Sequence, residues 1–200
     1  MNYTKTTAQA ALMARFGSVE MHSGPETIRR RDNVRPSFRD TWSIEHALRH
    51  GDVFEVKEDG RWAFVTVRAG EAVLVSRTGS EMARFAVDSD ADAVLCAEYL
   101  VGQPACRKGS PRHGQVVAFD CVEFDGASLQ DRPLSERRYA AASVVAGLDA
   151  RFELVEQLPT AGLDVASLAG ALQAADDEGI VVKDTASTFG AVWTRFKRRA

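Results

Sequence analysis

Residues 53–77, VFEVKEDGRWAFVTVRAGEAVLVSR, indicate the fold because three short runs in this stretch alternate apolar and polar side chains. Alternation with a period of two is typical of a half-buried β-strand. The pattern therefore predicts strands over Val53–Lys57, Trp62–Arg68 and Ala72–Arg77. Ala69-Gly70 lies between the last two runs and suits a tight hairpin turn. Together the three runs predict an antiparallel meander.

The rest of the chain predicts further strands and several helices. Strands are expected over Ala93–Val101, Val116–Phe124, Gly179–Lys183 and Ala191–Lys197. Helices are expected over Thr6–Phe16, Ser43–Arg49, Ser135–Leu148 and Val165–Ala175. Ser43 and Ser135 are of a residue type that caps helix N-termini. Strands followed by helices and then by more strands predict an α+β fold, with antiparallel β-sheets flanked by helices.

One domain is expected from the length and the composition. A chain of 200 residues that is 45% hydrophobic can bury a core of its own. Residues 1–50 comprise the N-terminal helix and a polar, arginine-rich segment, His22–Arg39, which is expected to be an irregular connection. We assign this part to the same domain as residues 51–200, because no Pro/Gly-rich linker divides the chain after residue 40.

Charge and cysteine content exclude several classes of protein. With 25 basic and 28 acidic residues the net charge is −3, so no global positive field attracts nucleic acid, and any grip on a polyanion is local. Three cysteines without CxxC spacing argue against a disulfide framework and a zinc site. No apolar run approaches the roughly 18 residues that span a bilayer, and a signal-peptide pattern is missing. We expect a cytoplasmic protein without a membrane partner.

Lys57 is notable because it ends an alternating strand and is followed by Asp59 and Gly60. A lysine amine attacks an electrophile only when it is neutral, and burial or nearby cations favour that form. A rigid strand and a glycine that lets a substrate approach closely also suit a nucleophile. A solvated strand lysine is the alternative, and this segment alone leaves both interpretations open.

Lys57, Asp59 and Gly60 spell KxDG, and five later stretches resemble, in the same order, the motifs of the covalent nucleotidyltransferases. This superfamily contains ATP-dependent DNA ligases, RNA ligases and mRNA capping enzymes. The stretches are LVSRTGSE (74–81), VLCAEYLV (94–101), VVAFDCVEFDGASLQDRPLSERR (116–138), EGIVVK (178–183) and WTRFK (193–197). They cover about residues 50–200. DRPLSERR favours DNA ligases, so the chain most resembles the adenylation domain of an ATP-dependent DNA ligase.

The resemblance implies a role for each matched residue. Lys57 would be the nucleophile that carries AMP. The catalytic cations beside it would be Lys183, Arg195 and Lys197. The nucleotide-binding residues would be Glu55, Lys57, Arg77, Glu98, Phe119, Lys183 and Lys197. Among these, Glu98 would bind the ribose hydroxyls, Phe119 would stack on the purine, and Lys183 would contact phosphate. Glu178 would act on Mg²⁺, and Arg61 is a possible phosphate contact.

Each matched residue also has a structural interpretation when it is taken alone. Phe119 could be a core aromatic residue, and Glu98 could be a carboxylate at a strand edge. Arg77, Arg195 and Lys197 could be solvated charges on a sheet. Arg137 and Arg138 follow the expected cap Ser135 and are given a structural role. The order of the motifs along the chain favours the functional interpretation for the first five residues.

Three features depart from the family pattern. Trp62 stands where a basic residue is usual, two positions after the KxDG glycine, and Arg195 stands where lysine is usual. The sequence ends at Ala200, directly after WTRFK, the last of the five later stretches, whereas DNA ligases continue into an OB-fold domain. The resemblance therefore implies a nucleotidyltransferase domain without a C-terminal OB-fold. It also raises the possibility of a partner domain or subunit that replaces the OB-fold.

The function expected from the sequence is that of an ATP-dependent polynucleotide ligase. It would use ATP and Mg²⁺, form lysyl-AMP at Lys57, pass AMP to the 5′-phosphate of nicked DNA and seal the nick. Strand geometry would place Arg195 and Lys197 on one face, where both can meet one phosphate. An RNA ligase and a capping-type guanylyltransferase are alternatives with similar motifs. A module that binds nucleotide or nucleic acid without catalysis is an alternative of another class.

Overall fold

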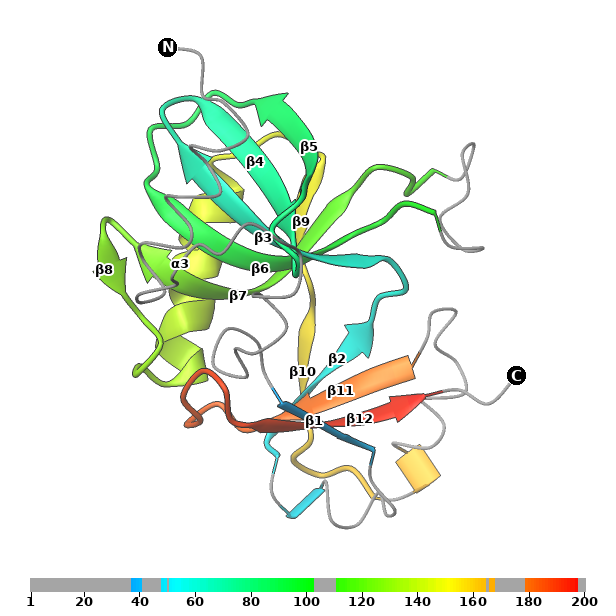
Figure 1. Ribbon diagram of the computed structural model, residues 1–200. Coiled ribbons are helices and arrows are strands. Elements are labelled where there is room, and N and C mark those ends of the chain that lie inside the picture. Colours follow the sequence, from blue (N-terminus) through cyan, green and yellow to red (C-terminus); the bar gives the residue numbers. More distant parts are fainter. Residues whose placement is uncertain are drawn as a thin grey trace.

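The computed structural model describes residues 37–40, 48–49, 51–102, 111–164, 166–167 and 179–197, of which it gives the backbone alone at 37–40, 192 and 197. This part of the chain forms two β-sheets and one long helix, α3 (Leu134–Ala146). In Figure 1 the larger sheet occupies the upper half of the molecule with α3 beside it, and the smaller sheet lies below. The chain passes between the sheets in the β2–β3 and β9–β10 segments.

The smaller sheet has five strands. In spatial order they are β1 (Ser37–Asp40), β12 (Val192–Lys197), β11 (Gly179–Lys183), β2 (Val53–Lys57) and β10 (Gln157–Pro159). All neighbouring strands in this sheet are antiparallel except β1 and β12, which are parallel. β1 and β12, which come from the two ends of the described chain, therefore lie side by side in the same sheet as β2.

The larger sheet has seven strands. Six follow one another in the order β5 (Glu81–Ala86), β4 (Glu71–Ser76), β3 (Arg61–Arg68), β6 (Ala93–Tyr99), β7 (Val116–Phe124) and β8 (Ala127–Ser128). The seventh, β9 (Phe152–Leu154), pairs in parallel with β7. The β3–β4 hairpin turns at Ala69 and Gly70, which both have positive φ (51° and 75°), as expected for a tight two-residue turn.

The predicted meander is wrong in one respect. β3 and β4 pair as expected, but β2 belongs to the other sheet, where it pairs with β10 and β11. The chain crosses between the sheets at residues 58–60. Gly60 makes this crossing possible, because a Cβ atom there would lie 2.6 Å from the carbonyl oxygen of Tyr99 at the end of β6. Alternation identified the strands correctly but did not determine their partners.

The strand boundaries agree closely with the sequence, and several short strands are additional. β2, β7 and β11 have the expected bounds, and the bounds of β3, β4, β6 and β12 differ by one or two residues. β1 lies partly inside the segment that was expected to be irregular. β5, β8, β9 and β10 were not expected either. These strands are short or lack clear alternation, and they depend on pairing with a neighbouring strand rather than on a local pattern.

The helix α3 matches the expected helix over 135–148, but its start differs. Its N-cap residue is Pro133, not Ser135, and no side chain caps it. Instead the backbone N–H groups of Leu134 and Ser135 donate to the carbonyl oxygens of Ser187 and Thr185, at 2.8 and 3.0 Å. Carbonyl groups of the loop between β11 and β12 thus accept hydrogen bonds from the first backbone N–H groups of α3. The helix expected over 6–16 lies outside the described residues, as do most of those expected over 43–49 and 165–175.

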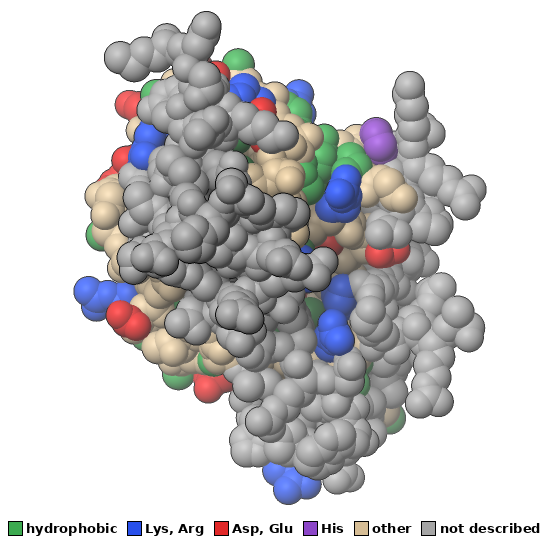
Figure 2. All heavy atoms as spheres, in the orientation of Figure 1, with side chains coloured by type: hydrophobic (Ala, Val, Ile, Leu, Met, Phe, Trp, Pro, Cys, Tyr) green, Lys and Arg blue, Asp and Glu red, His purple; other side chains and the backbone are tan. Residues whose placement is uncertain are grey.

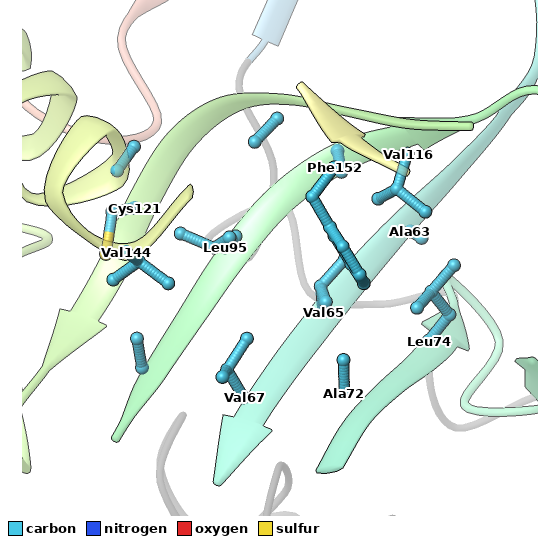
Figure 3. Close-up of a cluster of buried hydrophobic side chains, with 14 of the residues drawn as sticks. Ala63, Val65, Val67, Ala72, Leu74, Leu95, Val116, Cys121, Val144 and Phe152 are labelled. Atoms are coloured by element: carbon cyan, nitrogen blue, oxygen red, sulfur yellow. The ribbon is translucent and has the colours of Figure 1, made fainter. Parts of the chain in front are cut away.

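The main core lies between the larger sheet and α3. Figure 3 shows Val65, Leu95 and Phe152 on this face of the sheet with Val144 of α3 beside Cys121. The opposite face of this sheet buries a smaller cluster around Phe64, and the smaller sheet buries Phe54, Ile180, Val182 and Phe196 on one face. Among the described residues no helix is long and apolar enough to cross a membrane.

Candidate active site

A cleft lies between the two sheets and contains five of the ten residues that the motifs selected. The cleft opens to solvent. Its lining residues are Glu55, Val56, Lys57, Glu58, Trp62, Glu98, Val117, Phe119, Val155, Val181, Lys183 and Trp193. Figure 2 shows basic and acidic side chains gathered on the right of the molecule, between the two sheets.

Lys57 is the last residue of β2 and is half-buried in this cleft. In the strand register it lies beside Gly179 of β11, and Gly179 in turn lies beside Lys197 of β12. The middle position of this row has no side chain. Because adjacent strands are about 4.8 Å apart, positions 57 and 197 are about 10 Å apart across Gly179. A phosphate group could lie between them.

Glu55 and Lys183 form a buried ion pair at the base of the cleft. Their side chains are 3% and 1% exposed, and the Lys183 Nζ donates to Glu55 Oε2. Burial lowers the pKa of Lys183 from its usual 10.5, and the charges of Glu55 and Asp120 offset this only in part. The Lys183 ammonium was expected at a phosphate, but here it contacts Glu55.

Two further side chains hold the other oxygen of Glu55. Gln157 Nε2 donates to Oε1 at 2.7 Å, and Arg138 Nη1 lies 3.8 Å from the same oxygen. Arg138 also donates through Nη2 to the carbonyl oxygen of Val155, and burial lowers its pKa. Glu55 is therefore held from β10, β11 and α3 together, so its carboxylate has a fixed orientation.

Aromatic rings cover the Lys183 ammonium. Its Nζ lies 3.8 Å from the ring centroid of Trp193 and 5.2 Å from that of Phe119. The two rings meet edge to face with centroids 6.0 Å apart. Phe119 is half-buried and lines the cleft, so one face of its ring can take a planar ligand. The structure thus brings Phe119, Lys183 and Glu55 together, as the sequence predicts.

Glu98 and Trp62 form the wall that the larger sheet contributes. They are direct partners in the β3–β6 register, and both line the cleft. The Trp62 ring packs edge to face on Phe64 at 4.5 Å, and its buried indole nitrogen has no hydrogen-bond partner among the described residues. A half-buried carboxylate at position 98 can accept hydrogen bonds from hydroxyl groups of a ligand.

Five predicted residues are not seen in the cleft lining. Arg61 begins β3 and Arg77 follows β4, and both are exposed at the end of the larger sheet that faces the cleft. Arg195 is half-buried on β12 beside Val181, and the side chain of Lys197 is outside the described part. Glu178 also lies outside it. Among the residues that are described, no group of three or more His, Cys, Asp or Glu side chains could hold a metal ion.

Several residues around the cleft were not selected from the sequence. Glu58 occupies the unspecified position of KxDG and pairs with Arg112, which is 54 positions away. Arg138 and Gln157 act on Glu55. Each of these contacts joins residues from different elements, so no local pattern could reveal it. The choice of a structural role for Arg137 agrees with its position, since it is fully buried against Asp120.

Comparisons with known proteins identify a family and a shared fold. The model of the ATP dependent DNA ligase domain matches residues 86–198. The ligase domain from M. tuberculosis LigD is 20% identical with a TM-score of 0.59, covering 83% of this chain and 60% of that one. A mycobacterial DNA ligase D complexed with ATP and MES is 22% identical with a TM-score of 0.57, covering 84% and 62%.

A structure from the Lig E DNA ligases, described as binding DNA with a minimal scaffold, is 15% identical with a TM-score of 0.55, covering 82% of this chain and 69% of that one. At these identities the solved structures establish a shared fold. The chain spans about 60% of the length of the first two. No curated protein matches it.

Proposed function

Since the chain belongs to the family of ATP dependent DNA ligase domains, we propose that it is an ATP-dependent polynucleotide ligase that prefers nicked DNA. Lys57 is its nucleophile. The observation that carries this proposal is the position of Lys57 in one cleft together with Glu55, Glu98, Phe119 and Lys183. These residues come from both sheets, and each supplies a contact that a nucleotide requires.

In the first step the neutral Lys57 amine attacks the α-phosphorus of ATP. A P–N bond forms, the bond from the α-phosphorus to the bridging oxygen breaks, pyrophosphate leaves with the electron pair, and the nitrogen releases one proton to the solvent. Such a transfer depends mainly on in-line placement and on stabilisation of charge. Arg195 and Lys197 supply positive charge, and the register that sets Lys57, Gly179 and Lys197 in one row supports this assignment.

The base of the cleft selects adenine. Adenine presents an amino donor beside a ring-nitrogen acceptor. Glu55 offers an acceptor and Lys183 a donor next to each other, and both line the cleft. Lys183 therefore contributes to nucleotide binding at the base rather than at a phosphate. Phe119 stacks on the purine, and Glu98 accepts hydrogen bonds from the ribose hydroxyls.

A divalent cation such as Mg²⁺ would be held by Glu178 together with the phosphates of ATP. Magnesium is commonly bound by one or two carboxylates together with substrate phosphates, so one protein carboxylate fits its donor set. Glu178 directly precedes Gly179, whose backbone pairs with Lys57. When bound, the cation neutralises charge on the leaving pyrophosphate.

Two further transfers complete nick sealing. Lysyl-AMP passes its AMP to the 5′-phosphate of the nick, which frees the lysine and forms a phosphoanhydride. The 3′-hydroxyl then attacks this 5′-phosphate, and AMP leaves. Exposed Arg61 and Arg77, at the cleft end of the larger sheet, contact phosphates of the nucleic acid.

Labelling tests the first step. The protein is incubated with Mg²⁺ and ATP labelled at the α-phosphate, and acid-labile label on the chain is measured. We expect label on the wild type, none on Lys57→Ala or on Lys57→Arg, which keeps the charge, and unchanged labelling of Arg84→Ala. Arg84 is bound to Glu71 and Glu81 in the larger sheet, outside the cleft lining.

The outcomes separate the alternatives. Labelling by GTP instead of ATP would indicate a capping-type guanylyltransferase. If neither nucleotide labels the protein, the proposal is contradicted, and a module that binds without catalysis is the remaining alternative. Nicked DNA and nicked RNA duplexes, offered side by side, then distinguish a DNA ligase from an RNA ligase by the joined product.

A further inference from the structure

The residue that follows Lys57, Glu58, is bound by an arginine from the turn that precedes β7 of the larger sheet. Arg112 donates through Nη1 to Glu58 Oε2 and through Nη2 to Glu58 Oε1, both at 2.9 Å. The Glu58 side chain is only 10% exposed, and that of Arg112 is 38% exposed. Two parallel hydrogen bonds between a guanidinium and a carboxylate fix direction as well as distance, which a lysine could not do.

Arg112 is itself held in place by the larger sheet. Its Nε donates to Gln115 Oε1 at 3.1 Å, and Gln115 Nε2 donates to Glu153 Oε1 at 2.9 Å. The backbone N–H of Leu100 donates to the carbonyl oxygen of Gln115 at 2.9 Å. The guanidinium therefore has a fixed position relative to β6, β7 and β9.

The crossing segment 58–60 is held at a second point by Gly60, which lies against the backbone of Tyr99. Lys57 comes directly before this segment and is the last residue of β2. The two contacts tie the end of β2 to the larger sheet, whereas the rest of β2 belongs to the smaller sheet. The position of the Lys57 backbone thus depends on both sheets.

We propose that Arg112 and Glu58 position the Lys57 amine for attack by clamping the end of β2 to the larger sheet. This inference rests on the proposed function. Arg112 is outside the cleft lining, so it is a positioning residue rather than a catalytic one. Reacting atoms must approach to about 3–3.5 Å in line, and a misplacement of about 1 Å can cost roughly 100-fold in rate. Loss of the clamp therefore slows the attack more than it weakens ATP binding.

The test measures single-turnover labelling of Lys57 over a range of ATP concentrations. For Arg112→Ala we expect the maximal rate to fall about 10- to 100-fold, with a half-saturating ATP concentration changed by less than about threefold. Arg84→Ala is the matched control, because it removes an arginine of comparable exposure, 26%, that is also paired with carboxylates in the larger sheet. Its rate should equal that of the wild type.

A second variant tests whether Arg112 and Glu58 act through their shared contact or independently of each other. Glu58→Gln keeps the shape of the side chain and removes its charge, so it should slow labelling to a similar degree. The double variant should be no slower than the worse single variant, because both changes break one contact. The proposal would be overturned if the losses in labelling rate of the two single variants multiplied in the double variant. It would also be overturned if Arg112→Ala were labelled at the wild-type rate.

Amide hydrogen exchange supplies a measurement that does not depend on activity. In Arg112→Ala the amides of residues 57–61 should exchange faster than in the wild type, and in Arg84→Ala they should not. Unchanged exchange at 57–61 would overturn the clamp even if labelling slowed. If the wild type accepts no label from ATP, the proposed function fails, and the exchange result alone then decides whether the clamp holds β2.

Discussion

Lys183 carries an ammonium group where water cannot reach it. A single buried charge costs several kcal/mol, and a partner with good geometry is needed to offset that cost. Glu55 provides the partner, and the rings of Trp193 and Phe119 provide further attraction for the cation. The pair is thus a polar site inside an otherwise apolar cleft base, and its donor and acceptor are fixed before any ligand arrives.

The pH dependence of stability tests this environment. Burial lowers the pKa of Lys183 below 10.5, so between the folded pKa and 10.5 the unfolded chain binds more protons than the folded one. The free energy of unfolding of the wild type should therefore rise with pH in that window, relative to Lys183→Met/Glu55→Gln, which carries neither group.

Urea unfolding from neutral pH toward 10.5 measures the difference between the two proteins. A difference that stays constant or falls with increasing pH would contradict the lowered pKa of Lys183. A change in the urea dependence itself would show that the variant altered the surface exposed on unfolding rather than the proton balance.

At the scale of elements, α3 fastens the β11–β12 loop to the larger sheet. Arg137 on α3 is fully buried and donates to both oxygens of Asp120, through Nε at 2.9 Å and Nη2 at 3.0 Å. Its Nη1 donates to the carbonyl oxygens of Arg132 and Ser187 at 2.6 and 2.9 Å. The stretch DRPLSERR, which resembles DNA ligases most closely, therefore joins the two sheets that form the cleft.

Removal of Arg137 should destabilise the whole protein. Arg137→Ala leaves the carboxylate of Asp120 buried without its partner, so we expect the free energy of unfolding to fall by about 3–5 kcal/mol. Arg132→Ala is the control, since the Arg132 side chain is 63% exposed and lies 4.0 Å from Glu136; its loss should cost less than about 1 kcal/mol. Urea denaturation measures both, and equal losses would contradict the proposed difference.

At the scale of the whole molecule, the net charge of −3 limits how nucleic acid can be held. Binding has to depend on a few local cations rather than on a general positive field. Arg61 and Arg77 are exposed at the same end of the larger sheet, next to the cleft. If both contact nucleic acid, as we propose, these phosphate contacts lie beside the proposed site of AMP transfer.

Binding to a nicked DNA duplex should be weak and steeply dependent on salt. Each phosphate contact contributes about −0.9 to the slope of log affinity against log salt, so Arg61→Ala/Arg77→Ala should make the slope shallower by about 1.8. Fluorescence anisotropy at several KCl concentrations measures the slope. Arg132→Ala, which removes an exposed arginine beside α3, should leave it unchanged. An unaltered slope in the double variant would exclude both arginines as phosphate contacts.

The sequence by itself determined seven of the described strands, the α3 helix and the motif order from Lys57 to Lys197, because alternation and helical spacing are local and show which faces can be buried. Only the tertiary structure decided that β2 leaves the predicted meander, that Lys183 contacts Glu55, and that Arg112 grips Glu58. Strand partners and ion pairs depend on residues that lie far apart in the chain. Their energies come from register, burial and geometry, which no local pattern encodes.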